Sequence, residues 1–98
     1  MNFVFEKERL SALSRDGIPM GHIAFPQIRP GLVNITHVAA VPEFRCQGVE
    51  EGMMEALLSH LSGRGQKAAL TSPFAQQYVG THSEWKHILP GRIHFGTH

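Results

Sequence analysis

LVNITHVAAVPEFRCQGVE, the stretch from Leu32 to Glu50, decides the fold of this chain. Its first part, Leu32–Val41, is rich in β-branched residues and predicts the best strand of the sequence, about ten positions long. From Gly48 the apolar residues recur at steps of three and four, which predicts an amphipathic helix that ends near Gly63. A long strand, a glycine-containing loop and a helix therefore follow one another at the centre of the chain.

Shorter elements are predicted on either side of this unit. The segment before it predicts one or two short strands up to Ser14, and then an apolar segment, Met20–Phe25, that Pro26 ends. After the helix, Lys67–Leu70 is short and apolar enough to form a strand. A strand, a helix and a strand in succession imply a parallel crossover connection.

Two short helices are predicted near the C-terminal end. They are Phe74–Tyr78, broken near Gly80, and Ser83–Ile88, with Ser83 as its N-cap. After Pro90 the sequence offers few anchoring residues, so the tail over residues 90–98 is expected to be loose. The predicted fold class is α+β, with a mixed, mainly antiparallel sheet and two to three helices.

The length and composition limit the classes of protein that this chain can be. With 98 residues it is expected to form one domain over residues 1–98, because a barrel enzyme needs roughly 200 residues or more. Apolar residues make up 42% of the chain and charged residues 17%, a globular balance. Nine scattered basic residues against eight acidic ones give a net charge of +1, which does not indicate a nucleic-acid partner.

The cysteine count and the N-terminal sequence bear on location. One cysteine, Cys46, allows no disulfide within the chain, and a reducing compartment is the simpler interpretation. Where a signal peptide needs an apolar run, this sequence has the charged residues Glu6, Lys7, Glu8 and Arg9. No apolar stretch approaches the length of a membrane-spanning helix. We therefore expect a cytoplasmic protein with no membrane partner.

The loop between the long strand and the helix is the best candidate for chemistry. A helix N-terminus presents unpaired N–H groups and a partial positive charge, which together can hold a phosphate. Arg45 could add a charge-assisted hydrogen bond to the same anion. The alternative is an ordinary strand-to-helix loop in which Gly48 only makes the turn.

The residues of this loop resemble a known family motif. Arg45-Cys46-Gln47-Gly48-Val49-Glu50 is similar to the pyrophosphate-binding motif of the GNAT superfamily of acyl-CoA N-acyltransferases, which reads Arg or Gln, two residues, Gly, one residue, then Gly or Ala. The resemblance extends to the small single-domain members of that superfamily. It rests on three further segments: Ile35–Arg45, with a histidine eight positions before the arginine, Lys67–Ala75 and His82–Trp85.

The resemblance implies an acyl-CoA N-acyltransferase fold and an acyl-CoA, normally acetyl-CoA, as co-substrate. It places the cofactor-binding residues at Ala39, Ala40, Val41, Arg45, Cys46, Gln47, Gly48, Val49 and Glu50. Two departures matter. Glu50 replaces the last small residue of the motif and would repel a pyrophosphate unless its side chain points away. Ser72 stands where the subgroup usually has cysteine, so a covalent acyl-cysteine is not available at that position.

The implied reaction moves an acetyl group to an amine by direct attack, and an alkyl amine must lose a proton before it attacks. His37 is the candidate general base, and the alternative is a histidine that packs on the sheet. Backbone N–H groups around Ala39, Ala40 and Val41 could stabilise the thioester oxygen as it gains charge. Ser72 could protonate the leaving thiolate, and its alternative is a helix N-cap before Pro73.

Two other functions stay open on the sequence alone. One is a CoA-binding module with little or no catalysis, which the altered motif and Ser72 favour. The other is a protein-interaction domain that has lost the cofactor site, which Glu50 and Glu51 favour. The seven histidines show no metal-ligand spacing, so no metal is expected. A protein N-terminus, a lysine and a small polyamine are all compatible acceptors.

Overall fold

The computed structural model describes residues 1–44 and 47–90. Within these residues seven strands, two α-helices and two 3-10 helices follow one another along the chain. Their order is β1 (Asn2–Phe5), β2 (Arg9–Leu13), β3 (Pro19–Ala24), β4 (Gln27–Arg29), β5 (Leu32–Ile35), β6 (His37–Ala40), η1 (Pro42–Phe44), α1 (Val49–Gly63), β7 (Lys67–Leu70), α2 (Pro73–Thr81) and η2 (Ser83–Ile88).

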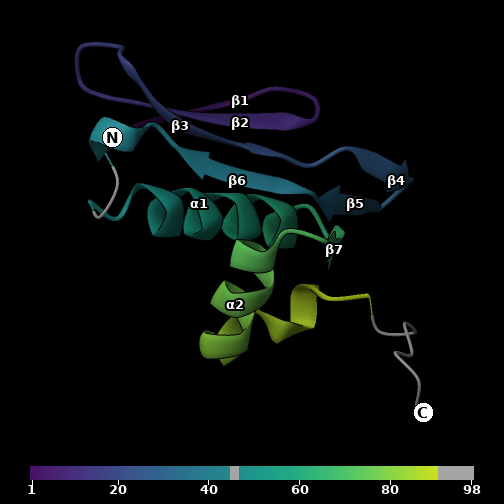
Figure 1. Ribbon diagram of the computed structural model, residues 1–98. Helices are drawn as coiled ribbons and strands as arrows, with labels where there is room; N and C mark the ends of the chain where they lie inside the picture. Colours follow the sequence, from purple (N-terminus) through teal and green to yellow (C-terminus); the bar gives the residue numbers. More distant parts are fainter. Residues whose placement is uncertain (45–46, 91–98) are drawn as a thin grey trace.

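The strands form two sheets (Figure 1). The first has four antiparallel strands in the order β1-β2-β3-β6, and the second has three strands in the order β4-β5-β7. Within the second sheet β5 is antiparallel to β4 and parallel to β7. α1 packs on one face of the four-stranded sheet, against β2, β3 and β6, and α2 lies on the same side (Figure 1). The predicted α+β class, with a mixed and mainly antiparallel arrangement, is confirmed.

The prediction of one continuous strand over Leu32–Val41 is wrong, because this stretch forms two strands that belong to different sheets. β5 pairs with β4 and β7, whereas β6 pairs with β3. The change takes place at Thr36, whose backbone N–H donates to the carbonyl of Ala24 at 3.1 Å. β3 ends at Ala24 because Pro26, two residues later, has no N–H to continue a ladder. The residues before His37 therefore find their partners in the second sheet.

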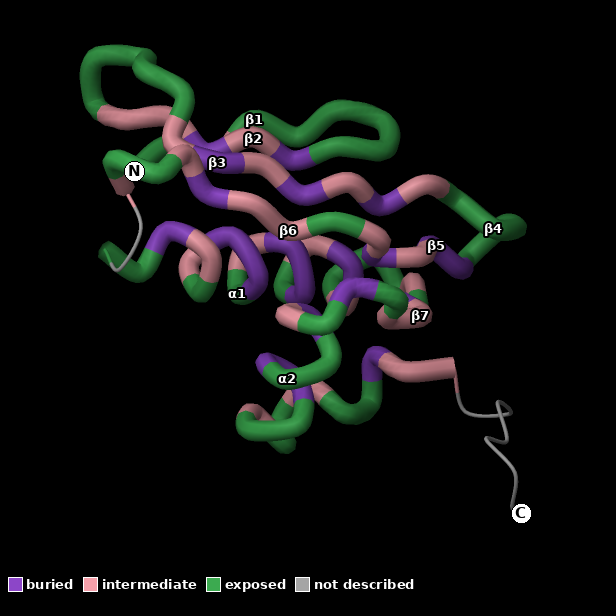
Figure 2. Tube along the Cα trace, in the orientation of Figure 1, coloured by how far each residue is buried: buried purple, intermediate pink, exposed green. Residues whose placement is uncertain are grey.

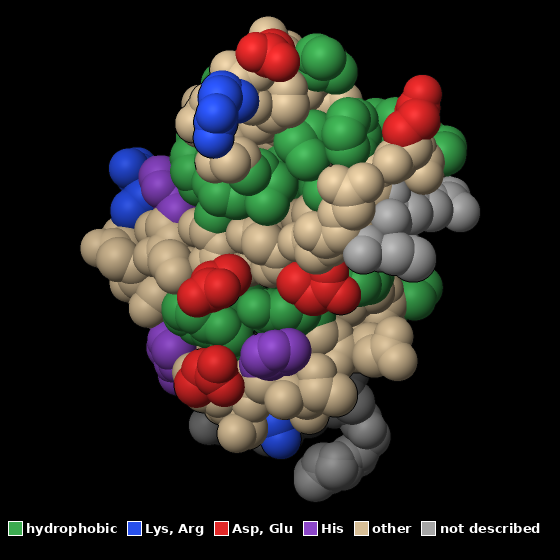
Figure 3. Space-filling view, turned by 90° about the vertical axis from the view of Figure 1, so that its left-hand side faces the viewer, with side chains coloured by type: hydrophobic (Ala, Val, Ile, Leu, Met, Phe, Trp, Pro, Cys, Tyr) green, Lys and Arg blue, Asp and Glu red, His purple; other side chains and the backbone are tan. Residues whose placement is uncertain are grey.

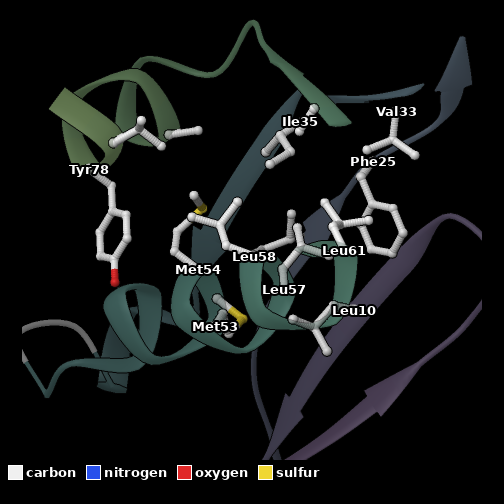
Figure 4. Packing of buried hydrophobic residues seen from close by; sticks show 14 of the residues in the cluster. Leu10, Phe25, Val33, Ile35, Met53, Met54, Leu57, Leu58, Leu61 and Tyr78 are labelled. Carbon is white, nitrogen blue, oxygen red and sulfur yellow. The ribbon is translucent and has the colours of Figure 1, made fainter. Parts of the chain in front are cut away.

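The core fills the space between the sheets and α1 (Figures 2 and 4). The buried face of α1 contributes Val49, Met53, Met54, Leu57, Leu58 and Leu61. Side chains of the sheets and of α2 complete the cluster, among them Leu10, Ile23, Ile35, Ala75 and Tyr78. The apolar spacing at three and four residues thus marked the buried face of this helix correctly.

Three smaller expectations need correction. β4, over Gln27–Arg29, was not predicted, since its exposed residues show no apolar alternation. The helix predicted over Phe74–Tyr78 runs from Pro73 to Thr81, so Gly80 does not break it. The helix over Ser83–Ile88 is 3-10, and its N-cap is His82 without a side-chain bond, not Ser83. The tail expected to be loose lies, from residue 91, outside the described residues.

Candidate functional site

β5 and β7 separate next to His37 and Ser72, the two predicted catalytic residues. β5 and β7 are parallel neighbours up to the pair Ile35–Leu70. The carbonyl of Ile35 then accepts the backbone N–H groups of both Thr71 and Ser72, each at 3.0 Å. Beyond this point one chain continues as β6 in the first sheet and the other turns into α2. The separation leaves β6 at the edge of its sheet.

β6 has a second edge with which no other described strand pairs. The backbone N–H of Val41 donates to the carbonyl of Met20 at 2.9 Å, so it faces β3. Because these groups alternate along an antiparallel ladder, Ala39 faces β3 as well, while Val38 and Ala40 face outward. Of the three predicted oxyanion donors, Ala40 is therefore the one whose N–H points away from the sheet.

The start of α1 lies one short loop beyond β6. Gly48 is its N-cap and adopts a left-handed conformation with φ of 77°, which favours glycine. No side chain of the described residues caps the helix, so the N–H groups of the first turn, which includes Val49 and Glu50, keep their partial positive charge. Gln47 is held by a hydrogen bond from its side-chain amide to the carbonyl of Glu43 at 3.3 Å. Arg45 and Cys46 lie outside the described residues.

His37 lies at the beginning of β6, at the point of separation, and not at the strand end nearest the motif. Its side chain is exposed, on the sheet face opposite α1, and stacks on His22 with ring centroids 5.5 Å apart. Burial, Arg9 and His37 together lower the pKa of His22 from its ordinary value. An exposed imidazole can exchange a proton with solvent or with a substrate amine. Three residues of β6, about 10 Å, separate His37 from the outward N–H of Ala40.

Ser72 lies beside the same point but is only 3% exposed. Its hydroxyl accepts the backbone N–H of Ala75 at 3.3 Å, and Pro73 follows it as the first helical residue. This is the N-cap role that the sequence offered as the alternative to catalysis. The structure thus brings Ser72 and the start of β6 together through Ile35, with the serine hydroxyl engaged in the cap.

The sequence did not mark a pocket between α1 and α2. It has a volume of about 290 Å³ and is lined by Glu51, Phe74, Gln77, Tyr78, Thr81 and His82. The rings of Tyr78 and His82 stack at 4.0 Å, and burial and then Glu55 raise the pKa of Tyr78. Tyr78 is part of the buried core and also lines this pocket. The four-residue spacing between Tyr78 in α2 and His82, its C-cap residue, was the available signal.

Acidic side chains surround this pocket and the start of α1. Glu50 is half-buried and Glu51 is exposed, both in the first turn of the helix. Figure 3, which views the end of the molecule where α1 begins, shows acidic and histidine side chains close together on this face. Since Glu51 lines the pocket, a phosphate bound there would meet a negative charge.

No helix of the described chain is long and apolar enough to cross a membrane. Among the residues that the structure describes, no three histidine, cysteine or acidic side chains gather as a metal site would require.

The chain was compared with curated proteins, with solved structures and with family models, and the matches agree on one family. A comparison with curated proteins found no match. A GCN5-like protein from Staphylococcus aureus, solved by NMR, has a similar structure with a TM-score of 0.73 at 16% identity, over 99% of this chain and 95% of that one. The N-acetyltransferase YhbS from Escherichia coli, solved with CoA, gives 0.61 at 18% identity, over 80% of this chain but 44% of that one. GCN5 from Tetrahymena gives 0.61 at 15% identity, over 96% of this chain and 62% of that one.

These similarities show the fold, and the sequence match assigns the family. Residues 10–88 match the family described as GCN5-related N-acetyl-transferase, which covers most of the chain. The protein therefore belongs to the GCN5-related N-acetyltransferase family.

Proposed function

We propose that this protein transfers an acyl group, normally acetyl, from coenzyme A to an amine. The carrying observation is the open edge of β6, which begins where β5 and β7 separate and ends beside the uncapped start of α1. Membership of the N-acetyltransferase family supports this use of the edge, as do relatives solved with CoA. Action in the cytoplasm stays a prediction.

The shape of the site suits a long ligand with a phosphate at one end. The first-turn N–H groups of α1, with Arg45 and Gly48, would hold the pyrophosphate. The extended arm would then run along β6, where Val38 and Ala40 direct their backbone groups outward. Its thioester would reach the start of the strand, about 10 Å away, where His37 lies.

The transfer reaction requires a general base and a hydrogen-bond donor that stabilises the developing oxyanion. His37 would take a proton from the amine, whose nitrogen then attacks the thioester carbonyl carbon. The negative charge that develops on the carbonyl oxygen would be stabilised by an outward backbone N–H of β6. Collapse of the tetrahedral intermediate forms the amide bond, breaks the carbon–sulfur bond and leaves the thiolate of CoA, which takes up a proton.

A titration of the ¹⁵N-labelled protein with acetyl-CoA tests the site. We expect saturable shifts at Val49 and Glu50 and slower hydrogen exchange at Ala40. Val41 is the matched internal control, because its N–H already bonds to Met20 and should exchange equally slowly with and without ligand. An absence of shifts at millimolar acetyl-CoA would contradict the proposal.

Acetylation assays then separate binding from transfer. Lysine peptides and small amines are offered in parallel, and His37→Ala is expected to abolish transfer while acetyl-CoA still binds. His60→Ala is the matched control, since that histidine lies in the last turn of α1 and stacks on Phe5. Equal transfer by His37→Ala and the wild type would contradict the role of His37 as base.

A second candidate function is a CoA-binding module without catalysis. Two observations favour it: Glu51 lines the pocket beside the start of α1, and the hydroxyl of Ser72 is buried in the helix cap. It predicts saturable binding of CoA with no acetyl transfer to any amine in the panel. Glu51→Gln is expected to tighten CoA binding in either case, because it removes one like charge near the phosphates.

A further inference from the structure

The charged and titratable side chains of the four-stranded sheet all lie on one face. Its strands β1, β2, β3 and β6 contain no aspartate or glutamate, and their charged or titratable residues are Arg9, His22 and His37. Alternate positions of these strands, among them Leu10 and Ile23, are buried against α1. Arg9, His22 and His37 occupy the other positions of the alternation. They therefore share the outer face of the sheet, which points away from α1 (Figure 1).

Arg9 and His37 lie in one row across three strands of this outer face. Arg9 of β2 pairs with Ala24 of β3, and Ala24 pairs in turn with His37 of β6. Since neighbouring strands lie about 4.8 Å apart, the Cα atoms of Arg9 and His37 are about 10 Å apart. The residue between them is an alanine, so no long side chain of the row stands between the guanidinium and the imidazole.

His22, in the next row, contacts both ends of this arrangement. Its ring stacks on that of His37 with centroids 5.5 Å apart. Burial lowers the pKa of His22, and the positive charge of Arg9 lowers it further, so the guanidinium lies close to the histidine pair. The acid next to Arg9 in sequence, Glu8, is engaged at the start of β4, where its carboxylate accepts the backbone N–H of Gln27 at 3.0 Å. The outer face thus presents positive charge beside the candidate base.

This charge distinguishes among the acceptors that the sequence left open. An alkyl amine is itself a cation near neutral pH until it loses its proton. A polyamine, or a lysine among other basic residues, would meet several like charges on the outer face. An acceptor that carries a carboxylate near its amine would instead gain an oppositely charged partner in Arg9.

The length of the row favours a peptide over a free amino acid. In a free α-amino acid the nitrogen and the carboxyl carbon are only about 2.5 Å apart, far less than the separation of Arg9 and His37. In an extended peptide a residue two or three positions away lies about 7–10 Å along the chain. A peptide with this spacing could place its amine at His37 while its acid contacts Arg9.

We propose that the acceptor is a peptide amine with an acidic residue two or three positions away, bound across the outer face with its acid on Arg9 and its amine at His37. The inference rests on the proposed acyl transfer and names the acceptor class for it. Arg9 is then the residue that determines acceptor specificity, and it takes no part in the movement of the proton.

Peptides that carry one reactive amine test the proposal, with acetyl-CoA as donor. One set has a single lysine and a blocked N-terminus, and the other has a free N-terminus and no lysine. Each peptide is made with glutamate or with arginine at the flanking positions. In at least one set we expect the kcat/KM of the glutamate form to exceed that of the arginine form by about fivefold or more.

Substitutions at position 9 test whether Arg9 causes this preference. Arg9→Gln should remove the preference, Arg9→Glu should reverse it, and Arg9→Lys should keep most of it. The matched control is Arg15→Glu, which changes the net charge as Arg9→Glu does. Arg15 is exposed and lies beyond the opposite end of β2, so this variant should keep the preference of the wild type.

A binding experiment separates this inference from the transfer reaction. The imidazole NMR signals of His22 and His37 should shift when the glutamate-flanked peptides are added to the wild type, and shift less in Arg9→Glu. Such shifts without acetylation of any peptide would contradict the transfer but support the acceptor class. Equal kcat/KM for the two flanks, or a preference unchanged in Arg9→Glu, would overturn the acceptor class and leave the transfer intact. Peptides that neither bind nor react would overturn both.

Discussion

β5 and β6 are consecutive in sequence and similar in length, yet they have opposite surroundings. β5 lies between two neighbouring strands, and three of its four residues are buried. β6 has β3 on one edge only, and its first residue, His37, is exposed. The comparison teaches that one continuous stretch of apolar sequence can place one half between two strands and the other half at the edge of a sheet. The predictions below test this division, from the largest effect to the smallest.

The largest effect is expected in β5. Ile35 is fully buried, so Ile35→Ala should lower the free energy of unfolding by about 2–5 kcal/mol through lost burial and a cavity. His37→Ala, two residues later on the exposed face, should change it by less than about 0.5 kcal/mol. Denaturant unfolding of both variants measures the difference. Similar losses in the two variants would break the distinction between the strands.

The next effect concerns Ser72, the N-cap of α2, whose backbone N–H bonds to Ile35 at the end of β5. Ser72→Ala removes the cap on Ala75 and should cost about 1 kcal/mol of unfolding free energy. Ser72→Thr keeps the hydroxyl and is expected to restore most of that loss. Ser83→Ala is the matched control, since no side chain caps η2. Thermal unfolding compares the three, and a neutral Ser72→Ala would contradict the structural role of this hydroxyl.

A third effect of similar or smaller size is expected at the loop after β6. Gly48→Ala places a side chain on a backbone with φ of 77° and should cost about 1 kcal/mol. It should also weaken acetyl-CoA binding, because the start of α1 must shift. Gly63→Ala, in the last turn of the same helix, meets no atom within 4 Å and should be neutral or slightly stabilising. Urea unfolding and an acetyl-CoA titration of both variants provide the measurement.

The smallest effect is a pH dependence on the open face of the sheet. The pKa of His22 is lowered in the folded state by burial, by Arg9 and by His37, so the unfolded chain binds a proton first as the pH falls. The contribution of neutral His22 to stability is therefore full above about pH 6.5 and is lost progressively below it. His22→Gln should make the fall in unfolding free energy between pH 7.5 and pH 5 shallower. Equal slopes for the variant and the wild type would contradict the lowered pKa.

The local elements could be predicted because their signals lie in neighbouring residues. The periodic apolar residues from Val49 to Leu61 define one face of α1. The start of α2 is marked by the side chain of Ser72, which caps the helix, and by the ring of Pro73, its first residue. β4 could not be predicted, since its three exposed residues have no apolar pattern and exist as a strand only through pairing with β5. The motif around Gly48 could be recognised, whereas the pocket at Tyr78 required α1 and α2 to be placed together.

By itself, the sequence determined the two α-helices, most strands, the glycine at the start of α1 and the resemblance to one family, because each of these depends on residue type and spacing along the chain. Only the tertiary structure decided that the stretch from Leu32 to Ala40 is shared between two sheets. It also decided that, among the described strands, β6 and β7 each lie at the edge of a sheet. The physical reason is that a strand's partners are chosen by hydrogen bonds to segments far away in sequence, and the sequence of the strand does not record which of its edges they take.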